Sequence, residues 1–287
     1  MNVADANSLD AVAGARLDRV ELSIGGIDLV RFRDYAHSFP RHSHDFFTIG
    51  VFSTGNGRIG HRGTSWSADD GSILAVSPEE VHTAEPRRDR GWTYTAMYPT
   101  PDFVARAFSD EERGSTFFPE PIFHDDDLAK RIVSTQRALM EPAPALDAEV
   151  MLLDVLRTLG ERHGVRPTGR GHLVTSSRAV RVARTYLNEH FTSPVKLAEL
   201  ASVCDVSPYH LVRSFRDAIG MPPHAYLTQI RSNHARDLIL RGVPVSTAAY
   251  RCGFADQSHL TRTFKRIFGV TPGAYVLASR RASTRGN

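Results

Sequence analysis

Two segments of the chain, 49 residues apart, carry the same side chains at the same spacing. The matching pairs are His210/His259, Leu211/Leu260, Arg213/Arg262, Phe215/Phe264, Gly220/Gly269, Pro223/Pro272 and Tyr226/Tyr275. A guanidinium at Arg213 or Arg262 can donate to the acceptor pair of guanine, and the Gln257 amide can pair with adenine. Two like sets of donors indicate two like contacts with one periodic ligand, and double-stranded DNA fits that description.

Other side chains in the two segments suit base edges or phosphates. Tyr209 and Val212 can touch a thymine methyl group, and His259 can read a base edge or bind a phosphate. Side chains one turn further on suit phosphates, which fix position rather than sequence; these are Arg216, Lys265 and Arg266. The alternative is that the arginines merely coat a helical bundle, and their paired recurrence argues against it.

The residues around each segment predict the elements that position these side chains. A short helix over 196–203, a break at Cys204-Asp205 and a helix capped by Ser207 form the first unit. A short helix over 245–250, a turn at Gly253 and a helix capped by Asp256 form the second. This order is typical of a helix-turn-helix, whose second helix enters the major groove.

A helix predicted over residues 224–240 joins the two units. Seventeen residues at about 1.5 Å each give a rod of roughly 25 Å. With the units packed on its ends, such a rod can hold two recognition helices about one DNA turn apart.

The net charge of +3 conceals an asymmetry between the two halves of the chain. Residues 171–287 contain 16 Lys and Arg against 6 Asp and Glu, which leaves 19 against 26 for residues 1–170. A half with a balance of +10 suits a polyanion, because neutralised phosphates release counterions.

The first half has a different pattern. Short apolar and aromatic runs from Val20 to Tyr98, separated by Gly, Asn and Asp, predict a small β-barrel or sandwich. Helices are expected over 127–140 and 146–163. A stripe in the second helix indicates core or, alternatively, a dimer seam; it comprises Leu152, Val155, Leu156 and Leu159.

Composition narrows the class of protein. No run approaches 18 consecutive apolar residues, and the N-terminus lacks the basic start and apolar run of a signal peptide, so we expect a cytoplasmic protein without a membrane span. Two cysteines, Cys204 and Cys252, are too few for a disulfide framework and are expected as small buried apolar groups.

The stretch from about Ser176 to Tyr275 resembles the DNA-binding module of the AraC/XylS family of bacterial transcription regulators, most closely in residues 249–275. The resemblance implies base contacts by Tyr209, Val212 and Arg213 in the first unit. In the second unit it implies contacts by Gln257, Ser258, His259 and Arg262. Asp205 departs from the family pattern, in which a turn glycine is frequent.

The first half resembles the cupin-type effector-binding and dimerisation domain of many members, in residues 40–44 and 71–83. His42 and His44 share a strand face, and His82 can join them inside a barrel. Three imidazoles could hold a transition metal, but enzymatic cupins carry a Glu three or four residues beyond the His-x-His pair, and none follows His44 here. We therefore expect neither catalysis nor a cofactor, but an effector pocket lined by His42, His44, Phe46, Trp66 and His82.

Together these features predict an α+β multidomain chain, a cupin-like β-barrel with flanking helices followed by an all-α double helix-turn-helix domain. The expected bounds are an arm over 1–16, the effector domain over 17–163, a linker over 164–173 and the DNA-binding domain over 174–280, with helix-turn-helix units at 195–217 and 245–267. Expected partners are double-stranded DNA, a small-molecule effector, a second copy of the chain and RNA polymerase. The expected function is that of a ligand-responsive transcription regulator, an activator or a repressor; the alternative is a metal-binding cupin sensor or enzyme that carries a DNA-binding tail.

Overall fold

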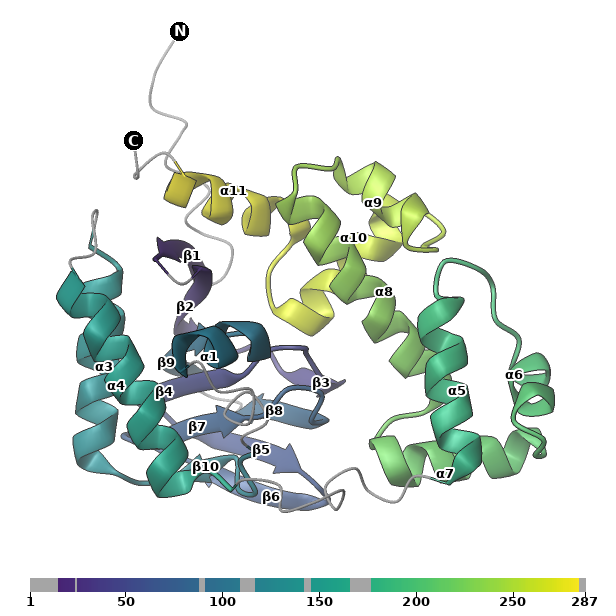
Figure 1. The fold of residues 1–287 in the computed structure, drawn as a ribbon, viewed down its shortest axis with the longest axis horizontal. Helices are drawn as coiled ribbons and strands as arrows, with labels where there is room; N and C mark the ends of the chain where they lie inside the picture. Colours follow the sequence, from purple (N-terminus) through teal and green to yellow (C-terminus); the bar gives the residue numbers. More distant parts are fainter. Residues whose placement is uncertain are drawn as a thin grey trace, which may run out of the picture. The chain divides into compact units, whose positions relative to one another are not determined.

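The computed structural model describes residues 15–23, 25–87, 91–108, 117–141, 146–165 and 177–283, which form two compact units (Figure 1). One unit is built mainly from residues 15–165 and the other from residues 177–273, and each has its own hydrophobic core. The expected arm lies outside the described residues except for Ala15 and Arg16, and the expected linker lies outside them from residue 166 onward.

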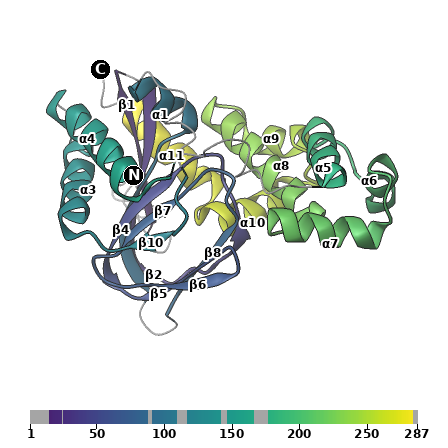
Figure 2. The same cartoon turned by 60° about the horizontal axis from the view of Figure 1, so that its bottom comes forward.

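Two β-sheets curve around a shared interior in the first unit (Figure 2). The six-stranded sheet has the order β1 (Ala15–Leu22), β2 (Gly25–Tyr35), β9 (Trp92–Tyr98), β4 (Thr48–Gly55), β7 (Ile73–Val76) and β10 (Ile122–Phe123). The four-stranded sheet has the order β3 (Phe39–His42), β8 (His82–Pro86), β5 (Gly57–His61) and β6 (Thr64–Ala68). The predicted small barrel is confirmed.

In the described part of the first unit, three helices accompany the barrel: α1 (Pro101–Phe108), α3 (Asp126–Leu139) and α4 (Leu146–His163). One face of the six-stranded sheet packs against α3 and α4, because apolar side chains alternate along β2, β4, β7 and β9 and meet the apolar stripes of both helices. The stripe of Leu152, Val155, Leu156 and Leu159 is buried in this core. Its interpretation as core is correct, and its alternative use as a dimer seam is wrong.

The opposite face of that sheet lines the barrel with aromatic rings. Phe32 stacks on Tyr94 with ring centroids 4.6 Å apart, and Phe52 contacts Trp92 at 5.1 Å. Gly57 of the facing sheet lies so close to Trp92 that a Cβ would approach the indole ring to 2.4 Å. The two sheets therefore meet tightly at this point, with the indole between them.

Seven helices follow in the described part of the chain beyond residue 177: α5 (Arg178–Glu189), α6 (Leu197–Val203), α7 (Pro208–Ile219), α8 (Pro223–Leu240), α9 (Val245–Arg251), α10 (Gln257–Phe268) and α11 (Pro272–Ser283). Their order confirms the predicted all-α domain with two helix-turn-helix units, α6–α7 and α9–α10. Among the described residues, no helix combines the length and apolar character that crossing a membrane requires.

Local signals explain where the recognition helices begin and end. The Ser207 side chain accepts a hydrogen bond from the His210 N–H at 3.2 Å, and the Asp256 side chain accepts one from the His259 N–H at 2.7 Å. Each side chain satisfies one of the N–H groups that a helix start leaves without a partner. Gly220 and Gly269, with φ of 85° and 79°, end α7 and α10 in the left-handed region.

Cys204 and Cys252 occupy corresponding positions at the ends of α6 and α9, and both are free and buried. Burial raises the pKa of both thiols, that of Cys252 to about 11. The expectation that they act as small apolar groups is confirmed.

Candidate functional site

Helix α7 separates its apolar side chains from its polar ones. Leu211 and Phe215 are fully buried, while Tyr209 is 77% exposed and Arg213 and Arg216 are exposed. Arg213 Nε lies 3.9 Å from the carboxylate of Asp217 one turn away, and both side chains are open to solvent. An exposed pair of this kind is weak, so the guanidinium can exchange it for another acceptor.

Helix α10 repeats the arrangement. Leu260, Phe264 and Ile267 are buried, and the opposite face exposes all six residues predicted to contact DNA, namely Gln257, Ser258, His259, Arg262, Lys265 and Arg266. The His259 ring stands edge-on to Phe254 with centroids 5.3 Å apart, which orients it. Of the predicted DNA-contacting side chains on both helices, all are exposed except Val212, which is half-buried.

The helix between the units forms a firm support. Helix α8 has 18 residues and is about 27 Å long, and α7 and α10 both pack against it. Arg231 of α8 donates from Nε to the Phe191 carbonyl at 2.7 Å and from Nη2 to the Ser193 carbonyl at 2.8 Å. These bonds join α8 to the segment that follows α5.

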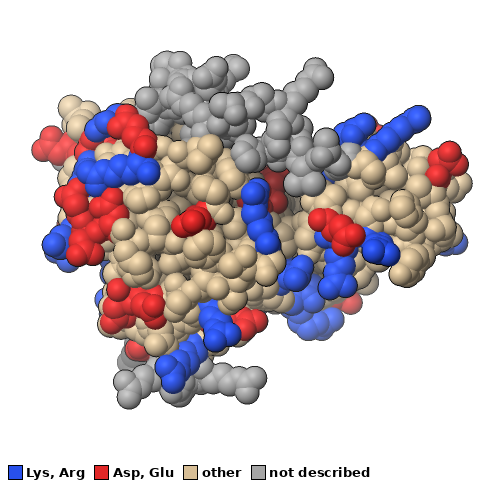
Figure 3. All heavy atoms as spheres, turned by 90° about the horizontal axis from the view of Figure 1, so that it is seen from below, with Lys and Arg blue, Asp and Glu red and all other residues tan. Residues whose placement is uncertain are grey.

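Basic side chains are also distributed unevenly. The last turn of α10 carries Lys265 and Arg266, where cations suit the helix dipole. Figure 3 shows Lys and Arg side chains at the right, where α5 to α7 lie, with a few acidic side chains among them, and acidic and basic side chains interleaved at the left, where α3 and α4 lie. The exposed basic residues of α7 and α10 suit a polyanion.

Three of the predicted effector-pocket residues come together in the barrel. One ring nitrogen from each of His42, His44 and His82 lies within 4.8 Å of the others, and all three side chains are buried. The rings of His44 and His82 are 5.0 Å apart and nearly perpendicular, and Phe46 stacks on His44 at 4.3 Å. The three histidines meet because His42 ends β3, which pairs with β8, and His82 is the first residue of β8.

The fifth predicted pocket residue, Trp66, occupies a separate position. It lies on β6, half-buried, directly opposite Ile59 of β5, and so shares the inward face of Ile59. No ring contact is found between Trp66 and the three histidines among the described residues. The indole that contacts the aromatic lining instead is Trp92, which the sequence analysis did not single out.

Two further site residues, His61 and Glu80, were also missed. His61 lies directly opposite His82 in the pairing of β5 with β8, and its Nε2 is 3.0 Å from the Glu80 carboxylate. Arg62 donates two hydrogen bonds to the same carboxylate, at 3.0 and 2.9 Å. The alternation from buried Ile59 to His61 places His61 inside, but its partner Glu80 depends on strand pairing that the sequence does not reveal.

Burial and neighbouring charges set the protonation of this region. Burial, the nearby His44 and His61 together lower the pKa of His82 to about 3, against the hydrogen bond to the Glu80 carbonyl. Burial of Glu80 acts to raise its pKa, but the hydrogen bonds from His61 and Arg62 outweigh burial and lower it to about 2. At neutral pH, His82 is a neutral imidazole and Glu80 an ionised carboxylate.

A chain of contacts leads from this cluster to the end of α4. The Arg62 guanidinium lies over the Phe117 ring, 4.2 Å from its centroid. Phe117 exchanges two backbone hydrogen bonds with Val165, at 3.0 and 2.8 Å. Val165 is the last described residue before residue 177, so the contacts join the barrel interior to the segment that leads into the helical unit.

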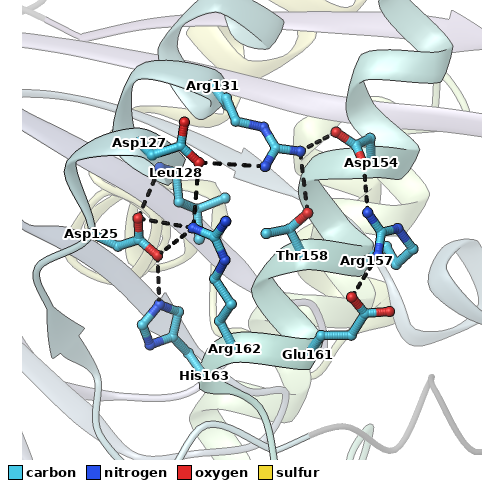
Figure 4. A network of polar contacts seen from close by, with 10 residues as sticks. All are labelled: Asp125, Asp127, Leu128, Arg131, Asp154, Arg157, Thr158, Glu161, Arg162 and His163. Carbon is cyan, nitrogen blue, oxygen red and sulfur yellow. Dashed lines mark hydrogen bonds and ion pairs between the residues drawn. The ribbon is translucent and has the colours of Figure 1, made fainter.

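A polar network joins α3 to α4 (Figure 4). Asp125 caps α3 by accepting from the Leu128 N–H at 3.0 Å, and it also pairs with Arg162 at 2.9 Å and His163 at 3.2 Å. Further along the helices, Asp154 pairs with Arg131 and Arg157. The network holds the two helices in register over the sheet.

Comparison with known proteins follows the same division of the chain. A family model of a helix-turn-helix domain matches residues 200–278, and one of an AraC-like ligand binding domain matches residues 24–153. The uncharacterized HTH-type transcriptional regulator YbfI of Bacillus subtilis is 30% identical over 237 residues, which are 82% of this chain and 86% of that protein. The HTH-type transcriptional activator RhaS of Escherichia coli is 25% identical over 245 residues, with the same shares of the two chains.

Solved structures share the fold. ToxT of Vibrio cholerae O395 superposes with a TM-score of 0.52 at 12% identity, over 92% of this chain and 96% of that one. Both halves of the sequence, the two recognition helices and the relatives agree, and the chain belongs to the AraC family of bacterial helix-turn-helix transcriptional regulators.

Proposed function

We propose that this regulator inserts α7 and α10 into two successive major grooves of one promoter site, in response to a small molecule bound in the barrel. The observation that carries the first part is the pair of capped helices, each with an exposed face at matching positions, held on one 18-residue helix. The rod of about 27 Å suits grooves about 34 Å apart once the units extend beyond its ends. A protein that reads promoter DNA in bacteria works in the cytoplasm.

The side chains divide into two roles. Arg213 and Arg262 grip guanine, Gln257 pairs with adenine, and the remaining base contacts come from Tyr209, Val212, Ser258 and His259. Arg216, Lys265 and Arg266 hold phosphates and fix the position of the module on the duplex. Exposure of both arginines supports these assignments, because neither is committed to a buried partner.

The barrel interior supports the effector part of the proposal. Trp92 is buried, and its indole N–H has no hydrogen-bond partner among the described residues. Such a buried donor costs about 1–3 kcal/mol, a cost that an acceptor on a bound molecule removes. The aromatic rings near it, with Phe32 stacked on Tyr94 and Phe52 tilted against Tyr94, favour a planar or apolar body. The effector is therefore a small molecule with an apolar part and at least one hydrogen-bond acceptor.

The contacts from Glu80 through Arg62 and Phe117 to Val165 provide a route for the response. A ligand that shifts the barrel lining would move Arg62 or Phe117 and so alter the segment after α4. The response is then a shift between arrangements of the two units with different promoter affinity. Self-association and contact with RNA polymerase belong to the same proposal. For self-association, α4 offers Leu146 and Val150, one turn apart and both exposed.

Binding measurements on operator and random DNA test the assignment of roles. Arg213→Ala and Arg262→Ala should each cost about 1–3 kcal/mol on the operator, roughly 5- to 150-fold in affinity, and relax the preference at one base position. Lys265→Ala should weaken binding to both DNAs alike. It should also reduce the slope of the logarithm of affinity against the logarithm of salt concentration by about one.

Arg241→Ala is the matched control, because it removes one exposed charge outside both recognition helices. Its effect on the operator should not exceed its effect on random DNA. Equal losses on operator and random DNA for Arg213→Ala and Arg262→Ala would show that these arginines do not read bases. A thermal-shift screen of small metabolites on the full chain then identifies the effector.

A further inference from the structure

Three buried imidazoles converge inside the barrel, and the family assignment gives them no role. We propose that His42, His44 and His82 bind one divalent transition-metal ion of the zinc type. The ring nitrogens already lie within 4.8 Å of one another. A tetrahedral ion with bonds of about 2.1 Å holds its ligands about 3.4 Å apart, so the widest pair would close by roughly 1.5 Å. We expect small shifts of the three side chains to supply that movement when the ion binds.

The hydrogen bonds of the three rings select the nitrogen that faces the ion. Nδ1 of His42 lies 2.8 Å from the Pro40 carbonyl, Nδ1 of His44 lies 2.7 Å from the Phe46 carbonyl, and Nδ1 of His82 lies 3.0 Å from the Glu80 carbonyl. A carbonyl oxygen can only accept, so each Nδ1 carries the hydrogen. Each Nε2 then carries the lone pair that coordinates a metal, and the carbonyl fixes the orientation of the ring.

This arrangement is hard to explain by packing alone. A histidine kept for packing needs one or two hydrogen bonds, and nothing in that role requires three rings to meet. The rings also share the same tautomer, because all three Nδ1 atoms have a backbone acceptor two residues away in the sequence.

The neighbouring side chains define the rest of the site. Glu80 is held by His61 and Arg62, so the ligand set has three nitrogens and no carboxylate. Such a set suits zinc, copper, nickel or iron rather than magnesium or calcium. Three protein ligands leave a fourth position for water or a small anion.

One competing bond yields a prediction with a definite sign. The Thr48 hydroxyl lies 3.0 Å from Nε2 of His44, and it must donate there because Nδ1 carries the hydrogen of the ring. A metal on that nitrogen has to displace the hydroxyl. Thr48 is buried, and Val has nearly the same shape. Thr48→Val should therefore tighten metal binding by about 2- to 10-fold, the worth of one hydrogen bond.

The proposal goes beyond DNA binding and does not depend on it, because the test measures the metal alone. The full chain is stripped with a chelator, titrated with Co²⁺ as a visible-absorption probe, and then with Zn²⁺ in competition. We expect one ion per chain, ligand-field bands of a four-coordinate Co²⁺ ion, and an unfolding temperature that rises with metal concentration.

Mutation of a residue that only supports a metal ligand weakens metal binding about 10- to 100-fold. His44→Ala and His82→Phe each remove a ligand and should weaken metal binding by at least that factor. His37→Ala is the control, because His37 lies in the same unit outside the cluster and should leave affinity unchanged. Tryptophan fluorescence and circular dichroism of the metal-free variants establish that they fold.

Absence of stoichiometric metal in the wild-type chain would overturn the proposal. So would metal binding that survives in folded His44→Ala and His82→Phe, or weaker binding in folded Thr48→Val. The last result identifies a site that does not use Nε2 of His44.

Discussion

Asp125 combines a helix cap with a link between two helices, and its removal tests how the barrel holds its helical layer. Its carboxylate is 15% exposed and accepts from the Leu128 N–H, from Arg162 and from His163. Partial burial acts to raise its pKa, but these partners outweigh burial and lower it from the ordinary 3.8 to about 2. That fall corresponds to at most about 2.5 kcal/mol of preference for the ionised form in the folded state, a value that solvent screening of the partly exposed pair reduces.

The separate contacts of Asp125 give the screened magnitude. Loss of an N-cap costs about 1 kcal/mol, and the paired cation adds about 0–1 kcal/mol at a partly exposed site. Asp125→Ala should thus lower the free energy of unfolding by about 1–2 kcal/mol. Asp125→Asn keeps the cap, since Asn caps as well as Asp, and should lose only the contribution of the paired cation, about 0–1 kcal/mol.

The pH dependence follows from the lowered pKa. The unfolded state takes up a proton near pH 3.8 and the folded state only near 2, so the stabilisation is complete above pH 3.8 and is lost as the pH falls toward 2. The difference in unfolding free energy between wild type and Asp125→Asn should stay constant from pH 7 to about 5. It should shrink steadily below pH 4.

Urea unfolding followed by tryptophan fluorescence is the appropriate assay, because both tryptophans, Trp66 and Trp92, lie in the first unit. Asp127→Ala is the matched control: its carboxylate is 65% exposed, lies 3.4 Å from Arg162 and does not cap the helix. We expect a loss of about 0.5 kcal/mol or less. Equal losses for Asp125→Ala and Asp127→Ala, or a difference that persists at pH 2, would refute the reasoning.

Two further predictions concern the core and the turns. Leu152→Ala should lower the free energy of unfolding by about 2–5 kcal/mol, measured with urea, because Leu152 is fully buried. Leu146→Glu should leave that stability nearly unchanged but weaken self-association in sedimentation velocity. The reverse pattern would place the contact between two copies of the chain on the buried stripe of α4. Gly253→Ala should lower the unfolding temperature of the helical unit because its φ is 73° and the new Cβ would lie 2.7 Å from the Thr192 carbonyl oxygen. Asp205→Gly, at φ 54°, should be neutral or slightly stabilising by the same calorimetric measurement.

The helical unit was predictable from the sequence because its signals are local. Ser207, Asp256, Gly220 and Gly269 each act within one turn of their own helix, so the sequence determines where α7 and α10 start and stop. The buried Leu and Phe of each helix repeat with the period of the helix. Exposure of the opposite face, including both arginines, then follows without knowledge of any distant partner.

The barrel was predictable only in part because strand pairing is not local. His42 and His44 are two residues apart, which indicates a shared side, but the contact of His61 with Glu80 depends on the register of β5 against β8. The apolar stripe of α4, which includes Leu152 and Leu159, could likewise be predicted only in part. Its period identifies an apolar face, but whether that face meets the sheet or a second chain depends on the distant strands β4 and β9.

The turns of the two helix-turn-helix units explain where the 49-residue repeat slips. After α6, the Asp205 N–H donates to the Ser202 carbonyl and the Val206 N–H to the Ala201 carbonyl. After α9, the Gly253 N–H donates to Tyr250 and the Phe254 N–H to Ala249, with the same spacings. Both turns are thus the same helix-ending motif, which needs a left-handed residue at its centre.

The slip therefore comes after the turn, not within it. Val206 leads directly to the cap Ser207, whereas Ala255 stands between Phe254 and the cap Asp256 and is exposed. The exposed Asp205 tolerates a side chain at the left-handed position, but Gly253 lies against the Thr192 carbonyl and Arg231, where a Cβ would collide. Glycine is required in the second unit by close packing, whereas the first unit forms the same turn with Asp205 at φ 54°.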